Sequence, residues 1–181
     1  MKWRGHVLTT LLAAALCVMA PMAVPTSPIP ITLATLGVYL AAGLLGPWRG
    51  TAAVGLYLAL GAVGLPVFAG FSAGFPVLFG PTGGFLWGYL LCVMVAGLLC
   101  RDHRRGLLPL RLAAGTVVLY AAGIMWMWLS TATPLGVVCL TVLPAVGGDI
   151  VKIAVATALI IPLRGRVRRL LSAGVKARDN L

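Results

Sequence analysis

The chain has 181 residues, of which 61% are hydrophobic and only 9% are charged. Soluble domains carry about 25% charged residues, so this composition excludes a water-soluble globular protein and predicts an all-α integral membrane protein. The formal net charge of +11 does not indicate nucleic-acid binding. The basic residues stand in short clusters between apolar runs, as topology signals and contacts with membrane lipid do.

Apolar runs along the chain predict six transmembrane helices. The runs cover residues 6–23, 33–45, 51–65, 85–100, 110–130 and 149–163. The first run follows Lys2 and Arg4, as in a secretory signal peptide, but Pro21 stands where cleavage would fall, so we expect a membrane helix there. We therefore predict a membrane domain over residues 1–163 and a basic cytoplasmic tail over residues 164–181.

Three connections are uncharged and rich in proline and glycine, and they are predicted to be irregular. They are residues 21–32, 66–84 and 131–148. Because lipid cannot satisfy exposed backbone groups, we expect the apolar and aromatic 66–84 segment to line a cavity or to pack inside the protein.

The distribution of charge predicts the topology. When the connections are assigned to alternate sides, all but one of the 14 Lys and Arg residues fall on one side, and the exception is Lys152. The positive-inside rule then places both termini in the cytoplasm. Asp149 and Lys152 become the charged residues of the outer half.

Asp149 and Lys152 are the main candidates for function. Residues three apart share a helix face, and charges at membrane depth are costly and usually functional. One interpretation is a mutual ion pair that fixes the last helix. The other is a ligand site, in which the carboxylate accepts N–H groups and the ammonium pairs with an anion. We expect Asp149 at the start of its helix, where free backbone N–H groups would assist. A ligand with a urea-like head and an acidic tail would suit both residues.

Other candidates lie in the 66–84 segment. Ser72 is the one polar side chain between Phe68 and Phe79, and it could contact a ligand. The run Pro81-Thr82-Gly83-Gly84 forms either a simple turn or a close approach of the backbone to a ligand. The chain has no G-x-x-x-x-G-K-[ST] sequence, so any ATP-driven step belongs to another protein. No motif predicts an enzyme, and the four cysteines do not form a metal-binding pattern.

Small residues in the first helix, namely Ala13, Cys17 and Ala20, form a smooth surface. Small residues permit close helix packing. The surface serves either packing within the protein or docking to another membrane subunit.

With these features, the chain resembles the BioY family, the substrate-binding (S) subunits of energy-coupling-factor biotin transporters. The resemblance extends over about residues 8–162. Its motifs are Pro30-Ile31-Thr32-Leu33, Gly46-Pro47-Trp48-Arg49-Gly50, the run from Gly61 to Gly70, Gly80-Pro81-Thr82-Gly83-Gly84, and Gly148-Asp149-x-x-Lys152.

The resemblance implies a protein of the bacterial cytoplasmic membrane with an outward-facing biotin pocket. Asp149 would hold the ureido ring and Lys152 the valerate carboxylate. Loops near Pro30–Thr32 and Phe71–Gly84 would close over the ligand. No cofactor would bind directly, and the partners would be a transmembrane T subunit and two cytoplasmic ATPase subunits. The Ala-x-x-x-Ala docking motif typical of such first helices is missing, and Ala13-x-x-x-Cys17 is its nearest equivalent.

Two other functions remain open from the residues alone. One is an S subunit for a different small vitamin. The other is a structural or assembly subunit without a ligand, in which Asp149 and Lys152 form only a salt bridge.

Overall fold

The structure, a computed structural model, describes residues 3–24, 31–100, 105–131 and 133–176. The predicted all-α class is confirmed. The helices are α1 (Trp3–Met19), α2 (Ala34–Val63), α3 (Phe75–Phe79), α4 (Gly83–Leu99), α5 (Leu108–Thr131) and α6 (Leu135–Lys176), with 3-10 turns η1 (Ala69–Phe71) and η2 (Arg105–Leu107). Two antiparallel two-residue strands, β1 (Ala23–Val24) and β2 (Ile31–Thr32), pair Ala23 with Thr32.

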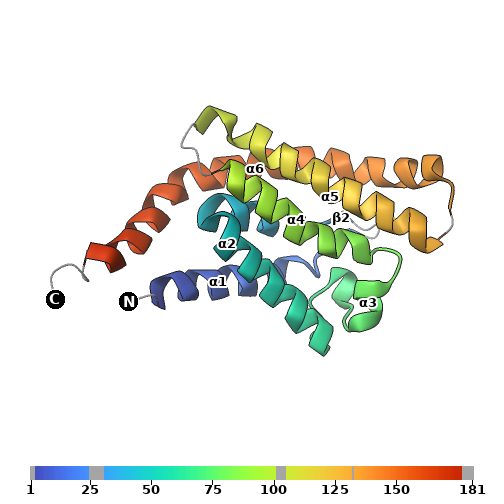
Figure 1. Cartoon of the computed structure of the whole chain (residues 1–181), viewed down its shortest axis with the longest axis horizontal. Coiled ribbons are helices and arrows are strands. Elements are labelled where there is room, and N and C mark those ends of the chain that lie inside the picture. Colours follow the sequence, from blue (N-terminus) through green and yellow to red (C-terminus); the bar gives the residue numbers. More distant parts are fainter. Residues whose placement is uncertain (1–2, 25–30, 101–104, 132, 177–181) are drawn as a thin grey trace.

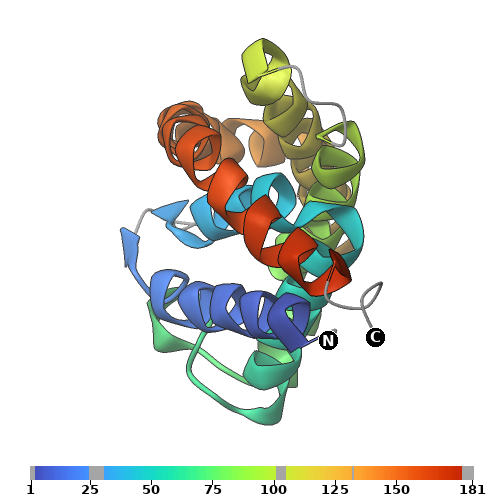
Figure 2. The same ribbon diagram turned by 90° about the vertical axis from the view of Figure 1, so that its left-hand side faces the viewer.

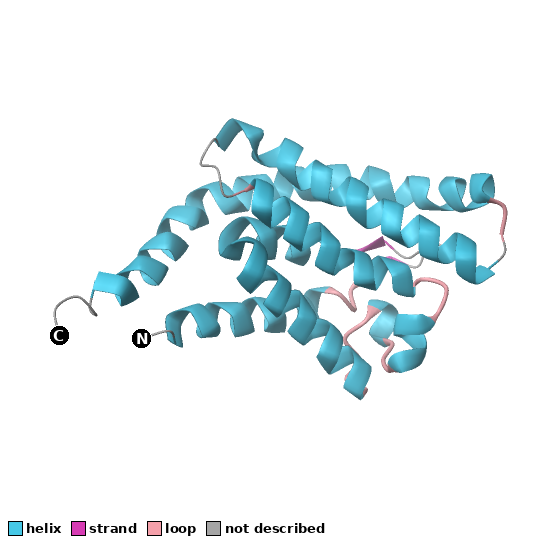
Figure 3. Ribbon diagram, in the orientation of Figure 1, coloured by secondary structure: helices cyan, strands magenta, loops and turns pink. Residues whose placement is uncertain are grey.

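The helices pack into one bundle. α4 contacts both α2 and α5, α6 packs on α5 and α2, and α1 packs on α2 (Figures 1 and 2). The start of α1 and the end of α6 lie at the same end of the bundle, and α3 lies at the opposite end (Figure 1). Most of the described loop segments gather around α3 (Figure 3). The described irregular segments are thus found mainly at this end.

The second and third predicted runs both form helix, and together they make up α2. The chain reverses within α2 at Gly46, which has φ 77° and ψ −171°. A β-carbon at Gly50 would lie 2.9 Å from the carbonyl oxygen of Ala41, whereas nine residues of a straight helix span about 13.5 Å. A β-carbon at Gly97 of α4 would lie 2.6 Å from the Pro47 nitrogen. Glycine at these positions lets the two halves of α2 and the neighbouring α4 approach closely.

The prediction of a loop over residues 131–148 is wrong. α6 begins at Leu135, where the N–H groups of Val137 and Val138 donate to the Pro134 carbonyl at 2.9 and 3.2 Å. Pro144 lies inside the helix, as membrane helices permit when neighbouring groups satisfy the freed carbonyl. Asp149 therefore lies in the interior of α6, and the expectation that it has free N–H groups at a helix start is also wrong.

In the part of the chain that the structure describes, two helical stretches are long and apolar enough to cross a membrane, by length and hydropathy. They are residues Leu108–Thr131 and Leu135–Val167, with mean hydropathies of 1.7 and 1.8. Two shorter apolar helices cover Gly5–Met19 and Gly83–Leu99. α6 continues past residue 163 to Lys176 without a break, and the Arg164 guanidinium donates to the Cys100 carbonyl at the end of α4. The start of the predicted tail is thus part of the last helix and is tied to the bundle.

Candidate functional site

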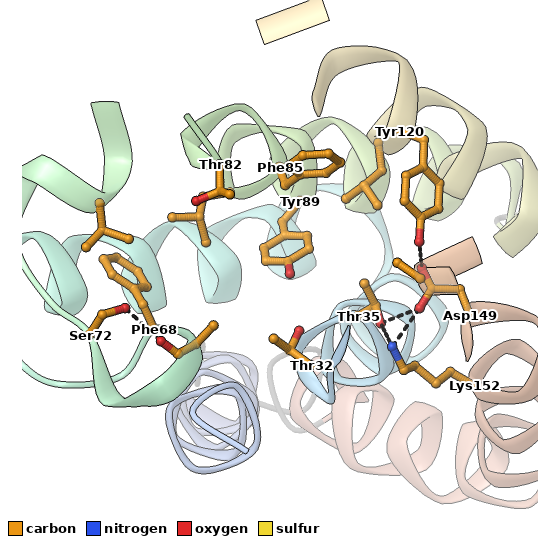
Figure 4. Close-up of a pocket in the computed structure, with 15 residues that line it drawn as sticks. Thr32, Thr35, Phe68, Ser72, Thr82, Phe85, Tyr89, Tyr120, Asp149 and Lys152 are labelled. Carbon is orange, nitrogen blue, oxygen red and sulfur yellow. Dashed lines mark hydrogen bonds and ion pairs between the residues drawn. The ribbon is translucent and has the colours of Figure 1, made fainter. Parts of the chain in front are cut away.

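A cavity of about 240 Å³ lies between the helices and the irregular segments (Figure 4). It receives side chains from β2, from α2, α4, α5 and α6, and from the segment that contains η1 and α3. Its lining residues are Thr32, Thr35, Phe68, Ala69, Ser72, Val77, Thr82, Phe85, Leu86, Tyr89, Leu119, Tyr120, Ala145, Asp149 and Lys152. The lining is mostly apolar and aromatic with a few polar groups, which is the usual composition of a small-molecule site.

Asp149 is the centre of a hydrogen-bonded cluster at one end of the cavity. Its Oδ1 accepts from Thr35 Oγ1 at 2.8 Å and from Lys152 Nζ at 2.8 Å, and its Oδ2 accepts from Tyr120 OH at 2.7 Å. Lys152 Nζ also donates to Thr35 Oγ1 at 3.0 Å. The Asp149 side chain is only 2% exposed. A buried carboxylate needs charge-assisted partners, and this cluster provides three of them.

The local sequence explains how three helices meet at this cluster. Asp149 and Lys152 are three residues apart on α6, so both side chains leave the same face of the helix. Thr35 lies in the first turn of α2, and Tyr120 lies at mid-length in α5. The hydroxyls of Thr35 and Tyr120 lie in apolar helices and each needs an acceptor. The Asp149 carboxylate accepts from both. The cluster therefore cross-links α2, α5 and α6.

The opposite end of the cavity has a different character. Phe68 and Ser72 lie across the cavity from Asp149, with Thr82, Phe85 and Tyr89 between the two ends (Figure 4). The Ser72 hydroxyl donates to the Ala69 carbonyl at 2.8 Å and keeps lone pairs that could accept from a ligand. The cavity thus has one charged end, aromatic walls and one weakly polar end.

Most of the predicted site residues meet in this cavity. Asp149, Lys152, Ser72, Thr32 and Thr82 all line it. The two interpretations of the acidic and basic residues turn out to be compatible, because the pair is a salt bridge with N···O 2.8 Å and also faces the cavity.

Three other predicted residues do not line the cavity. Phe71 is 70% exposed. It has φ 60°, and together with the left-handed Gly70 it turns the chain so that Phe68, not Phe71, points inward. Gly83 and Gly84 are buried by helix packing, because β-carbons there would overlap the Leu78 carbonyl and the Trp126 side chain. Pro30 lies outside the described residues.

Several residues that shape the site were not predicted from the sequence. They include Thr35, Phe68, Phe85, Tyr89 and Tyr120. A signal was present for three of them: Thr35 follows Thr32 at helical spacing, and Tyr89 and Tyr120 place phenol groups in the middle of apolar runs, where each hydroxyl needs a partner. For Phe68 and Phe85 we find no comparable signal, since a phenylalanine in a membrane protein is usually packing.

The small residues predicted to form one smooth surface of the first helix differ in their exposure. Ala13 is 1% exposed and Ala20 is fully buried, whereas Cys17 is half-buried. Leu16, on the same face, lies against Gly37 of α2. Ala13 and Ala20 therefore pack within the protein, which was the intramolecular alternative. The outward face of α1 carries Val7, Leu11 and Val18 instead.

Among the described residues, no group of three or more His, Cys, Asp or Glu could hold a metal ion. Fold and cavity together define an all-helical protein with apolar helices of membrane-spanning length and a small-molecule pocket at one end of the bundle. The sequence model of the BioY family matches residues 1–169, and the chain belongs to this family.

Individual relatives agree with this assignment. The chain is 41% identical over 143 residues to the biotin transporter BioY of Rhodobacter capsulatus, covering 70% of this chain and 74% of the relative. It is 37% identical over 152 residues to the biotin transporter BioY of Thermotoga maritima, covering 83% and 90%. The crystal structure of an S-component for biotin from an ECF-type ABC transporter superposes with a TM-score of 0.82 at 25% identity, covering 91% of this chain and 92% of that one.

Proposed function

We propose that this protein captures biotin from outside the cell and carries it across the bacterial cytoplasmic membrane as the S component of an energy-coupling-factor transporter. The relatives named biotin transporters and the fold of the biotin S-component support the ligand. The observation that carries the proposal is the Asp149–Lys152 pair at the charged end of an apolar cavity.

The cluster has hydrogen-bonding capacity left for a ligand. A carboxylate offers about four lone-pair sites and an ammonium three N–H donors. Counting the hydrogen bonds of the described residues, Asp149 uses three acceptor sites and keeps one on Oδ2, and Lys152 uses two donors and keeps one. The cluster can therefore accept one hydrogen bond and donate one to the same small group.

A ureido ring presents this combination, because each N–H stands beside the carbonyl oxygen. Asp149 accepts from the N–H and Lys152 donates to the carbonyl. This assignment revises the role that the resemblance implied for Lys152. Its Nζ is 2.8 Å from Asp149 Oδ1, so both residues act on the head of the ligand. The valerate carboxylate then extends past Thr82 toward the end of the cavity that carries Ser72.

The rings and the chain of biotin pack against the apolar part of the cavity. Phe68, Phe85 and Tyr89 supply aromatic surface there (Figure 4). Phe85 also lies edge-on to Tyr120, with ring centroids 6.2 Å apart, which holds the phenol that bonds Asp149. Aromatic burial supplies affinity and the polar end supplies orientation.

The transport part of the proposal includes six membrane spans, counting each half of α2 as one, with both termini in the cytoplasm. The start of α1 and the end of α6 lie at the end of the bundle opposite α3 (Figure 1), and basic residues flank those ends in the sequence. Energy comes from ATP bound by partner ATPase subunits, joined through a transmembrane T subunit. A reporter fused to the C-terminus that is active only in the cytoplasm should be active; activity only of a periplasmic reporter would contradict this topology.

The ligand is tested by native mass spectrometry of the purified protein after incubation with an equimolar mixture of biotin, thiamine and riboflavin. We expect one bound mass, that of biotin. Retention of thiamine or riboflavin without biotin would assign the protein to another vitamin. Retention of none would favour a structural subunit.

A further inference from the structure

Residues 66–74 form one wall of the cavity and connect α2 to α3. Phe68, Ala69 and Ser72 of this segment line the cavity. Apart from the single 3-10 turn η1 the backbone is irregular, with positive φ at Gly70, Phe71 and Gly74, so no α-helical hydrogen-bond ladder holds it in place. Its position depends on a few attachments to its neighbours.

The Phe68 side chain is the largest of these attachments. It is fully buried, and its ring lies edge-on to Tyr57 of α2 with ring centroids 5.6 Å apart. The ring also covers Gly61, one helical turn further along α2, so closely that a β-carbon there would overlap three of its atoms. Gly61 thus provides the slot that receives Phe68.

Hydrogen bonds within the segment join Phe68 to Ser72. The Phe68 N–H donates to the Ser72 carbonyl at 3.0 Å, and the Ser72 N–H and hydroxyl both donate to the Ala69 carbonyl. Further described main-chain hydrogen bonds attach the segment to other parts of the chain: Gly74 N–H to the Gly61 carbonyl at 2.8 Å, Gly70 N–H to the Pro21 carbonyl at 3.3 Å, and, at the end of the segment, Val77 N–H of α3 to the Gly74 carbonyl at 3.2 Å. Displacing the Phe68 ring would therefore displace the wall that contains Ser72.

The following part of the connection, residues 75–82, is attached elsewhere. Trp87 Nε1 donates to the Leu78 carbonyl at 3.3 Å and Trp126 Nε1 donates to the Gly80 carbonyl at 3.1 Å. This part is held mainly by α4 and α5; α3 also contacts α2, but no described hydrogen bond joins residues 75–82 to Gly61. The two parts meet at Gly74, which has φ 92° and can absorb a change of direction.

We propose that Phe68 is a positioning residue whose insertion over Gly61 holds the 66–74 wall closed and so sets how long the ligand stays bound. The inference that Phe68 controls the release of biotin rests on the proposed function. The attachment itself does not, because it can be measured without a ligand.

The test uses the full-length protein and two matched substitutions in α2. Gly61→Ala places a methyl group in the slot, whereas Gly55→Ala places one where no atom lies within 4 Å. We expect the dissociation rate of biotin to rise about tenfold in Gly61→Ala, because changes at one interface act mainly on dissociation. We expect Gly55→Ala to match the unmodified protein.

A second substitution separates loss of the slot from general damage. Phe68→Leu replaces the ring with a smaller side chain and leaves room for the methyl group added at position 61. The double variant Gly61→Ala/Phe68→Leu should therefore bring the dissociation rate back to within about threefold of the starting value. If Gly61→Ala does not fold, Phe68→Ala leaves the helix intact and should release biotin about tenfold faster. Equal rates in Gly61→Ala and Gly55→Ala, or no recovery in the double variant, would overturn the proposal.

Hydrogen exchange without ligand provides the independent measurement. Peptides covering residues 66–74 should exchange at least about fivefold faster in Gly61→Ala than in Gly55→Ala, with peptides from residues 75–82 unchanged. If this difference is found but the protein binds no biotin, the attachment is correct and the proposed function is wrong. If biotin binds and the exchange is the same in both variants, the attachment is wrong and the proposed function stands.

Discussion

The Asp149 end of the cavity is assembled by hydrogen bonds between side chains of three helices, whereas the Phe68 end is a short irregular segment held mainly by packing. At the first end every polar group has a partner in α2, α5 or α6. At the second end one buried ring and two main-chain hydrogen bonds hold the segment to α2 and to Pro21, just after α1. The first arrangement suits recognition, because buried polar networks fix geometry. The second suits access, because it can open without breaking the bundle.

The largest effect is expected from breaking the charged end. Asp149→Asn leaves the partly buried Lys152 ammonium without its counter-charge and replaces one acceptor oxygen with an NH₂ donor. The ligand N–H loses a charged acceptor, which contributes about 1.5–3 kcal/mol, and the position of Lys152 is disturbed as well, so biotin affinity should fall by roughly 100-fold or more. Isothermal titration of the purified variant measures this. A biotin affinity within about threefold of that of the unmodified protein would show that Asp149 does not bind the ligand.

Exchanging the two charges separates a salt bridge from a site. In Asp149→Lys/Lys152→Asp both charges remain on the same face of α6, so folding should be retained, as judged by the thermal midpoint in detergent. Binding should still fall by about 100-fold, because the donor and the acceptor are exchanged relative to Thr35 and Tyr120. Binding that survives the exchange would leave the pair with a structural role only.

The role of Lys152 is sharpened by changing the other end of the ligand. Lys152→Gln should weaken biotin by about 30-fold, since a hydrogen bond to a charged group contributes about 1.5–3 kcal/mol. The same substitution should weaken the binding of biotin amide, which lacks the carboxylate, by the same factor. If only biotin is weakened and the amide is unaffected, Lys152 holds the carboxylate, as the family resemblance first implied.

Removing a single hydroxyl from the charged end should have a smaller effect. Tyr120→Phe and Thr35→Val each remove one hydrogen bond to Asp149. We expect affinity to fall about five- to tenfold, which corresponds to about 1–1.4 kcal/mol. Tyr39→Phe is the control for the first, because Tyr39 bonds Thr116 and does not line the cavity. Thr157→Val is the control for the second, because Thr157 bonds its own helix. Equal losses in targets and controls would mean that these hydroxyls act on folding alone.

The smallest effect is expected at the part of the connection that α5 holds. Trp126→Phe removes the indole N–H that bonds the Gly80 carbonyl, which should lower the free energy of unfolding by about 1 kcal/mol. The dissociation rate of biotin should change by less than about twofold, because the 66–74 wall keeps its own attachment. A tenfold faster dissociation would show that the whole 66–82 connection opens together.

Much of the fold could be predicted from hydropathy, and the errors have a common cause. The apolar runs located α1, both halves of α2, α4 and α5, because helical length in an apolar run is a strong signal. The run before Asp149 was assigned to a loop since Pro134, Pro144 and several glycines suggested a break. In α6 the surrounding helices tolerate Pro144, and nothing local in the sequence reveals that support.

The candidate site was predicted in its chemistry but not in its geometry. Asp149 and Lys152 were identified because charges in an apolar run are rare. Their spacing placed both on one helix face but left open whether Lys152 bonds Asp149, and that bond changes what Lys152 can bind. Phe68 and Phe71 were indistinguishable in sequence. The positive φ of Gly70 and Phe71 decides which ring is buried, and that choice depends on Gly61, which belongs to another element.

The most direct test of recognition at the Asp149–Lys152 pair is competition against labelled biotin by two analogues. Desthiobiotin keeps the ureido ring and the acidic chain, whereas lipoate keeps an acidic chain and a sulfur ring but has no ureido group. If the pair binds the ureido group, desthiobiotin should compete within about tenfold of biotin and lipoate should be weaker by at least about 100-fold. Lipoate would leave the polar groups of Asp149 and Lys152 buried without a partner, and such sites strongly reject the analogue. Equal competition by lipoate and desthiobiotin would contradict the proposed recognition of the ureido group.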